Sequence, residues 1–237
     1  MDMSKKNSNH ANGASTATAS RWRRPISSCR PAAQKSRVRT LVVPNLQSSI
    51  SVWMIDSDSE LVYAPEAGFT QPERPGRRYG VEWNNFYRAR TWLTLDADAA
   101  WSHARYRVDP LGEGREIPDA IQGVVSAGVS VNDLGPVSGS LRGRHLGRRP
   151  LVSDGSVFSH ASFVLNGLMN VRLGGRFDVG VDIFNILDRK YEDIAYYFPT
   201  RIRDPRPGGT LESEAQDDFI THPGEPRSVR VRLRARF

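Results

Sequence analysis

The last ten residues of the chain, "SVRVRLRARF" (Ser228–Phe237), begin with a serine and then alternate strictly between apolar and charged side chains. A period of two places successive side chains on opposite faces of a β-strand. The segment therefore predicts a strand with four arginines on one face and an apolar row on the other. The apolar row consists of Val229, Val231, Leu233, Ala235 and Phe237.

The same period recurs along most of the chain after residue 45. Together with the terminal strand, it predicts eight antiparallel strands, the first seven at about 46–56, 78–88, 91–106, 119–131, 137–146, 161–173 and 176–187. The polar face of these strands carries charges of both signs, which can pair across neighbouring strands. This predicted charge ladder consists of Glu82, Asp96, Asp98, Arg142, Arg144, Asp182, Arg230 and Arg232.

The connections between the predicted strands alternate in length. Short turns are expected at 89–90, 132–136 and 174–175, and long loops rich in Pro and Gly at 57–77, 107–118, 147–160 and 188–225. In an up-and-down meander, all short turns then lie at one end of the sheet and all long loops at the other. Transmembrane β-barrels show this asymmetry.

The apolar face favours a membrane barrel over a solvated soluble sheet. It continues for five positions in two strands, which matches a tilted strand crossing a bilayer. Aromatic residues fall near strand ends, as an interfacial girdle requires: Tyr87, Trp92, Phe177 and Phe237. The predicted fold class is all-β, an antiparallel up-and-down transmembrane β-barrel portion of about eight strands with a disordered N-terminal tail.

Charge separates the chain into two parts. Residues 1–40 hold nine Lys/Arg and one acid, which leaves 33 − 9 = 24 bases against 26 − 1 = 25 acids in 41–237. Residues 1–44 show no periodicity and predict a disordered basic tail, whereas 45–237 form the barrel segment. Because the barrel segment is nearly neutral, no nucleic-acid partner is expected.

Few residues suggest chemistry. Histidines are scattered, and the sole cysteine, Cys29, lies in the tail. We therefore expect no catalytic site, no metal site and no cofactor, and the chain is not expected to be an enzyme. Aromatic and arginine side chains in the long loop 188–225 are possible extracellular ligand contacts: Tyr191, Tyr196, Tyr197, Arg201 and Arg203.

Four segments resemble TonB-dependent outer-membrane receptors, and the resemblance covers about residues 45–237. The segments are "RRYGVEW" (Arg77–Trp83), "LGRRPL" (Leu146–Leu151), "VGVDIFNILDRKYEDIAYYF" (Val179–Phe198) and "HPGEPRSVRVRLRARF" (His222–Phe237).

This resemblance implies a location in the outer membrane and the C-terminal part of a plugged 22-stranded barrel. Such receptors take up scarce ligands, such as iron-siderophore chelates or cobalamin, with energy relayed by TonB. It also implies that Val229, Val231, Leu233, Ala235 and Phe237 form a signal for the barrel assembly machinery. The expected partners are outer-membrane lipid and that machinery.

The sequence shows no plug domain, TonB box or signal peptide. We therefore expect a receptor fragment that is not transport-competent alone, with TonB coupling only if a plug were present. Two alternatives stay open. One is a self-contained eight-stranded outer-membrane anchor or adhesion barrel, and the other is a soluble β protein whose basic tail binds nucleic acid.

Overall fold

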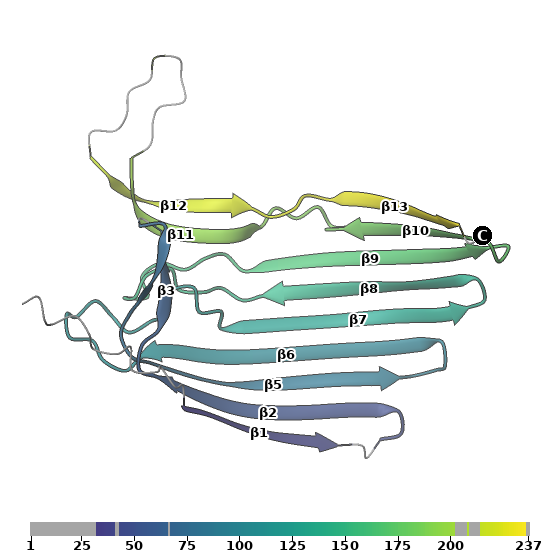
Figure 1. Ribbon diagram of the computed structural model, residues 1–237, viewed down its shortest axis with the longest axis horizontal. Coiled ribbons are helices and arrows are strands. Elements are labelled where there is room, and N and C mark those ends of the chain that lie inside the picture. Colours follow the sequence, from purple (N-terminus) through teal and green to yellow (C-terminus); the bar gives the residue numbers. More distant parts are fainter. Residues whose placement is uncertain (1–31, 41–42, 66, 202–207, 209–213, 236–237) are drawn as a thin grey trace, which may run out of the picture.

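The computed structural model describes residues 32–40, 43–65, 67–201, 208 and 214–235, and these form thirteen strands. Within these ranges, no helix is long and apolar enough to cross a membrane. Nine strands form one antiparallel sheet in the order β1-β2-β5-β6-β7-β8-β9-β10-β13 (Figure 1). Their bounds are β1 Ala32–Thr40, β2 Leu46–Ser57, β5 Gly76–Arg88, β6 Leu93–Tyr106, β7 Gly123–Leu134, β8 Val137–Leu146, β9 Ser162–Leu173, β10 Phe177–Phe184 and β13 Ser228–Ala235.

The eight predicted strands are all present, and the prediction of an all-β antiparallel meander is confirmed. The segment 137–146, for example, coincides with β8. The predicted asymmetry of the connections is confirmed as well. The turns between β5 and β6, β7 and β8, and β9 and β10 are short and share one end of the sheet, and the long connections lie at the other (Figure 1).

Two predicted loops contain further strands. The segment 57–77 includes the hairpin of β3 (Leu61–Ala64) and β4 (Phe69–Pro72), and 188–225 includes that of β11 (Glu192–Thr200) and β12 (Gln216–Pro223). The prediction of plain loops is therefore wrong at these positions. Strands of four residues, such as β3 and β4, are too short to show a period in the sequence.

The prediction of a disordered tail is wrong for Ala32–Thr40. These residues form β1, which pairs along its whole length with the edge of β2, from Ala32 opposite Asp56 to Thr40 opposite Ser48. An edge strand offers a row of free backbone N–H and C=O groups, and pairing with it orders a segment of weak local propensity. Residues 1–31 lie outside the described residues, so disorder there stays a prediction.

The sheet is a single layer with one apolar and one polar face. Cross-strand register aligns the apolar positions into rows, such as Ile50, Trp83, Ala99 and Val125. No second layer of the described chain covers these side chains, because Val229, Val231 and Leu233 of β13 are 62%, 68% and 72% exposed. An apolar face of this extent on a water-soluble protein would be covered, so it indicates a lipid-facing wall.

Aromatic residues mark both ends of the apolar face. Near the long connections, Trp101 stacks on His103, and the Tyr79 ring lies 5.3 Å from the His103 ring. Tyr87 lies eight residues further along the same strand as Tyr79, at the opposite end. Eight residues of extended chain span about 26 Å, close to the height of the apolar band in membrane barrels.

The sheet has two free edges in the part of the chain that the structure describes. Eight antiparallel steps separate β1 from β13, so these two strands run in the same direction. Joining them would require a parallel pair, whereas bacterial membrane barrels have even strand numbers and close antiparallel. No pairing closes the described strands, so they form a section of wall with two open edges.

A small core lies at the end with the long connections. It contains Ala104, Tyr106, Ile117 and Ala120, with Val62 of β3 packed against them. We call this assembly of β3, β4, β11 and the connections 107–122 and 147–161 the cap. It is the only part of the described chain with a cluster of fully buried apolar side chains.

Candidate functional site: a charged face and a cap cavity

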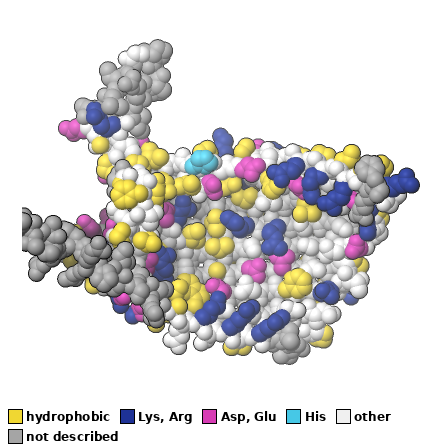
Figure 2. All heavy atoms as spheres, viewed as in Figure 1, with side chains coloured by type: hydrophobic (Ala, Val, Ile, Leu, Met, Phe, Trp, Pro, Cys, Tyr) yellow, Lys and Arg dark blue, Asp and Glu magenta, His cyan; other side chains and the backbone are white. Residues whose placement is uncertain are grey.

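All eight residues of the predicted charge ladder lie on the same face of the sheet. The register places Glu82 opposite Ala100, Asp98 opposite Ser126, and Ser126 opposite Arg144, while the apolar rows lie on the other face. Figure 2 shows Lys, Arg, Asp and Glu side chains spread across this face. Facing lipid, each of the arginines would cost about 2–4 kcal/mol at the bilayer midplane and each carboxylate somewhat less, which indicates that this face is the wet one.

Two residues of the charge ladder form an ion pair across an intervening strand, where a glycine leaves space for their side chains. Arg142 Nη2 of β8 lies 2.7 Å from Asp96 Oδ2 of β6, and Gly128 of β7 stands between them in the same row. A Cβ atom on Gly128 would approach Asp96 Oδ1 to 2.8 Å and Arg142 Nη2 to 3.1 Å. The bare backbone thus lets side chains two strands apart meet.

The charged face holds a second ion pair within the ladder and one between the ladder and the edge strand β1. Arg232 Nη2 of β13 lies 2.8 Å from Asp182 Oδ1 of β10, and Lys35 Nζ of β1 lies 3.1 Å from Glu82 Oε2. The ladder therefore cross-links β5 to β1, β6 to β8 and β10 to β13. Partly exposed pairs of this kind contribute at most about 1 kcal/mol each.

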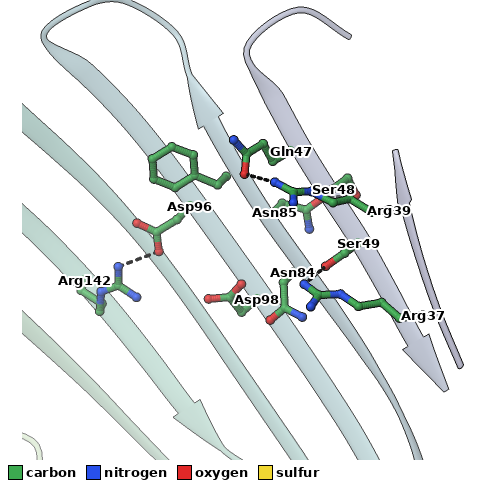
Figure 3. A pocket seen from close by; sticks show the side chains of 11 residues that line it. Arg37, Arg39, Gln47, Ser48, Ser49, Asn84, Asn85, Asp96, Asp98 and Arg142 are labelled. Atoms are coloured by element: carbon green, nitrogen blue, oxygen red, sulfur yellow. Dashed lines mark hydrogen bonds and ion pairs between the residues drawn. The ribbon is translucent and has the colours of Figure 1, made fainter. Parts of the chain in front are cut away.

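A shallow hollow of about 420 Å³ opens on the charged face beside β1 (Figure 3). Arg37 donates to Ser49 Oγ at 3.2 Å and Arg39 donates to Gln47 Oε1 at 2.7 Å, so β1 is fixed by side chains as well as backbone. Asp98 also lines this hollow. Its two serine hydroxyls, those of Ser48 and Ser49, bond to Asn85 and Arg37 and not to a carboxylate or a histidine, so no activated nucleophile is formed among the residues that line it.

The cap encloses a second cavity, of about 240 Å³, which lies between β3, β4, β11 and the connections 107–122 and 147–161. Its walls include the rings of Tyr63 and Tyr196, whose centroids are 5.4 Å apart. Arg74 also lines it. Its guanidinium lies 4.1 Å above the Tyr106 ring and its Nη1 lies 3.1 Å from Asp109 Oδ1.

Burial raises the pKa values of three side chains that line the cap cavity. Burial, with a contribution from Glu73, raises the pKa of Tyr106 to about 12. Burial also raises the pKa of Asp119, although the Arg149 guanidinium, 2.9 Å away, opposes the shift. The pKa of Tyr196 is raised by burial and by the Asp119 charge. Tyr106 and Tyr196 therefore remain protonated hydrogen-bond donors at neutral pH.

The structure separates the five predicted ligand contacts. Tyr196 and Tyr197 line the cap cavity. Tyr191 instead packs on Gly224, where an added Cβ would collide with its ring, so Tyr191 belongs to the base of the β11–β12 hairpin. Arg201 is exposed just beyond β11 and does not line the cavity. Arg203 lies outside the described residues.

Sequence reasoning missed most of the cavity. The missed residues come from segments predicted as loops or from a strand end: Tyr63, Gln71, Glu73, Arg74, Tyr106, Glu113 and Asp119. The one local signal in the sequence is Tyr106, a tyrosine at the end of the alternating segment that forms β6. In the structure this residue is almost fully buried. In the described residues, no group of three His, Cys, Asp or Glu side chains could hold a metal ion.

The proposed assembly-signal residues lie together on the apolar face of β13. Val229, Val231, Leu233 and Ala235 stand opposite Ile183, Val181, Val179 and Phe177 of β10. This geometry agrees with a lipid-facing row, and recognition by assembly machinery stays a prediction. Phe237 lies outside the described residues.

The fold is similar to known outer-membrane receptors. The ferric yersiniabactin uptake receptor FyuA from Yersinia pestis matches 86% of this chain with a TM-score of 0.65 and 14% identity, over 30% of its own length. The ferric-catecholate import receptor Fiu from E. coli K12 (TM-score 0.58, 15% identity) and the siderophore receptor PiuA from Acinetobacter baumannii (0.57, 10%) match 85% of this chain over 27% and 28% of theirs. No family model and no curated protein matches the sequence.

These matches define the class of fold. The described sheet has the fold of a section of the barrel wall of TonB-dependent outer-membrane receptors, as the sequence resemblance implied. The similar proteins are named as receptors for the uptake or import of ferric chelates and siderophores. The chain spans less than a third of their length.

Proposed function

We propose that this chain is a wall section of a TonB-dependent outer-membrane receptor that takes up a scarce ligand such as an iron-siderophore chelate. Residues 45–237 supply the receptor part, β1 extends its sheet by one strand, and the outer membrane is the proposed location. The observation that carries the proposal is the single-layer sheet with one bare apolar face and one charged, ion-paired face. Only lipid on one side and water on the other satisfies both faces.

The two open edges define what the remainder of the wall must supply. Because β1 and β13 run in the same direction, a section that closes the wall with antiparallel pairs must contain an odd number of strands. The proposed partners are such a section, outer-membrane lipid on the apolar face, and the barrel assembly machinery at β13. Because no pairing closes the nine described strands, we propose that the section alone is not transport-competent.

The proposal is tested by locating tryptophans relative to lipid. Trp83 and Trp101 lie in the apolar rows, whereas Trp53 lies opposite Lys35 and Gly80 on the charged face. Variants that keep one tryptophan each, with the others replaced by phenylalanine, are reconstituted in vesicles of brominated lipid, which quenches nearby indole fluorescence. We expect quenching of Trp83 and Trp101 and little quenching of Trp53; equal quenching of all three would contradict a two-faced wall.

A second candidate is a self-contained eight-stranded barrel that serves as an anchor or in adhesion. Two of the apolar-face positions of β1 carry Gln34 and Ser36, which suit lipid poorly, while a third carries Val38. Without β1, the first and last of the remaining eight strands, β2 and β13, would run in opposite directions. They could then pair antiparallel and close the sheet into a barrel. Heat-modifiable gel mobility of a chain lacking residues 1–40, absent from the full chain, would support this candidate over the open section.

A further inference from the structure

We propose that the cap cavity binds a small organic cation, a protonated amine or quaternary ammonium group that also carries a hydrogen-bonding oxygen. This inference rests on the proposed receptor function, because it names the chemical class of ligand that the cap would meet from outside. Two features of the cavity carry it, its aromatic walls and its unbalanced carboxylates, and the Tyr106 hydroxyl supplies a further contact.

The aromatic walls provide faces for a cation. The ring centroids of Tyr63 and Tyr196 lie 5.4 Å apart at an interplanar angle of 37°, so the two rings pack against each other at a tilt, and both residues line the cavity. Tyr63 is exposed, which places it at the mouth of the cavity, and Tyr196 is half-buried. An ammonium group over such ring faces is attracted by about 0.5–2 kcal/mol, increasing as water is excluded.

The charges that line the cavity favour a cation over an anion. Of the four charged lining residues, Arg74 is neutralised by Asp109 and lies over Tyr106, and Asp119 is paired with Arg149. Glu73 and Glu113 form no ion pair with any described residue, and Glu73 Oε1 accepts one hydrogen bond, from Gln71 at 3.0 Å. Two carboxylates thus remain uncompensated, and the cavity would repel a carboxylate or phosphate.

The Tyr106 hydroxyl provides a further contact. Tyr106 lines the cavity, and the residue as a whole is only 2% exposed. The raised pKa keeps this hydroxyl protonated, so it can donate to an oxygen of the ligand.

Choline tests the inference, because it combines a quaternary ammonium with a hydroxyl. Its neutral isostere 3,3-dimethylbutan-1-ol keeps the shape and the hydroxyl, and 3,3-dimethylbutanoate reverses the charge. Binding of each to the full chain, folded in detergent micelles, is measured by calorimetry. We expect choline to bind about tenfold more tightly than the alcohol, and the anion not to bind.

Variants assign the binding to the cavity. Glu73→Gln and Tyr63→Leu should each weaken choline binding about fivefold to tenfold and leave the alcohol little changed or, for Tyr63→Leu, modestly weaker. Tyr106→Phe should weaken choline and the alcohol alike, because both lose the same hydrogen bond. Asp193→Asn is the matched control, since Asp193 is an exposed carboxylate of β11 that does not line the cavity.

Three results would overturn the inference: choline no tighter than the alcohol, tighter binding of the anion, or choline binding that Glu73→Gln and Tyr63→Leu leave unchanged. These failures are separate from failure of the proposed function. The tryptophan-quenching experiment reports the two-faced wall whether or not the cap binds a cation.

Discussion

Arg142 of β8 meets Asp96 of β6 at 2.7 Å across the bare backbone of Gly128 in β7. A strand glycine usually weakens a sheet, because it adds backbone entropy to the unfolded chain and no side chain to the folded one. Here the missing side chain opens a passage between residues two strands apart. The charge ladder of the wet face therefore depends on where glycines stand as much as on where charges stand.

The first prediction concerns this passage. A double-mutant cycle with Asp96→Asn and Arg142→Gln should give a coupling free energy of about 0.5–1 kcal/mol, measured from urea unfolding in detergent. In a Gly128→Ala background the coupling should vanish, because the added methyl group occupies the passage. Gly123→Ala is the control, since its Cβ would meet only Ala100 O at 3.9 Å. Coupling that persists in the Gly128→Ala background would contradict the role of the glycine.

The second prediction concerns Asn185, a fully buried residue in the turn after β10 with φ of 48°. Its Nδ2 donates to the carbonyls of Arg189 and Glu225 at 2.9 and 3.1 Å, and its Oδ1 accepts from Arg189 N. Asn185→Asp should destabilise the fold by about 2–4 kcal/mol, because a carboxylate then faces two carbonyl oxygens.

Limited proteolysis provides the second readout for Asn185. Because its side chain bridges the two ends of the segment that carries β11 and β12, Asn185→Asp should speed cleavage within 188–225. Asn84→Ala, on the exposed charged face, should change neither cleavage nor stability by more than about 0.5 kcal/mol. Unchanged cleavage in Asn185→Asp would show that the hairpin is held by other contacts.

The third prediction concerns the pH dependence of the cap. Burial raises the pKa of Asp119 above its unfolded value, so the folded state binds a proton more tightly there. This contribution favours folding fully below the ordinary aspartate pKa of about 3.9 and is lost as pH rises through the raised value. Relative to the wild type, Asp119→Asn should therefore gain unfolding free energy as pH rises from the acid side to 7.

The comparison uses unfolding midpoints of the wild type and Asp119→Asn across the acid range. Asp188 should show the opposite sign, because hydrogen bonds from Arg227 lower the pKa of that carboxyl. Its contribution is present above the ordinary value and disappears as pH falls, so Asp188→Asn should lose stability at neutral pH and converge with the wild type in acid. If both variants followed the same slope, the assigned causes of these shifts would be wrong.

The sequence predicted the wall well because alternation is a local signal. The period of two predicts eight strands and the face on which each ladder residue lies. The length of each connection predicts the end of the sheet at which it lies. The strand β1 was not predicted because its apolar face carries the polar residues Gln34 and Ser36 and only one large apolar side chain, Val38. What ordered β1 is the free edge of β2, which no local pattern within 32–40 reveals.

The cap was far less predictable. Tyr63 and Tyr196 lie in different hairpins, and only the folded arrangement of β3 against β11 brings their rings together. Of the five loop residues proposed from composition, Tyr196 and Tyr197 line the cavity, while Tyr191 packs at the base of the hairpin. Residue type identified suitable side chains, but contacts between segments distant in the sequence decided which of them share a site.

The most direct measurement of the two-faced wall compares Met169→Arg with Leu168→Arg. These neighbours in β9 are similarly exposed, at 50% and 45%, but Met169 lies in the apolar row with Val181, and Leu168 lies opposite Asp182 on the charged face. In lipid vesicles, Met169→Arg should lower the free energy of unfolding by about 2–4 kcal/mol, and Leu168→Arg should change it by less than about 1 kcal/mol. Equal effects of the two substitutions would contradict a wall with lipid on one side and water on the other.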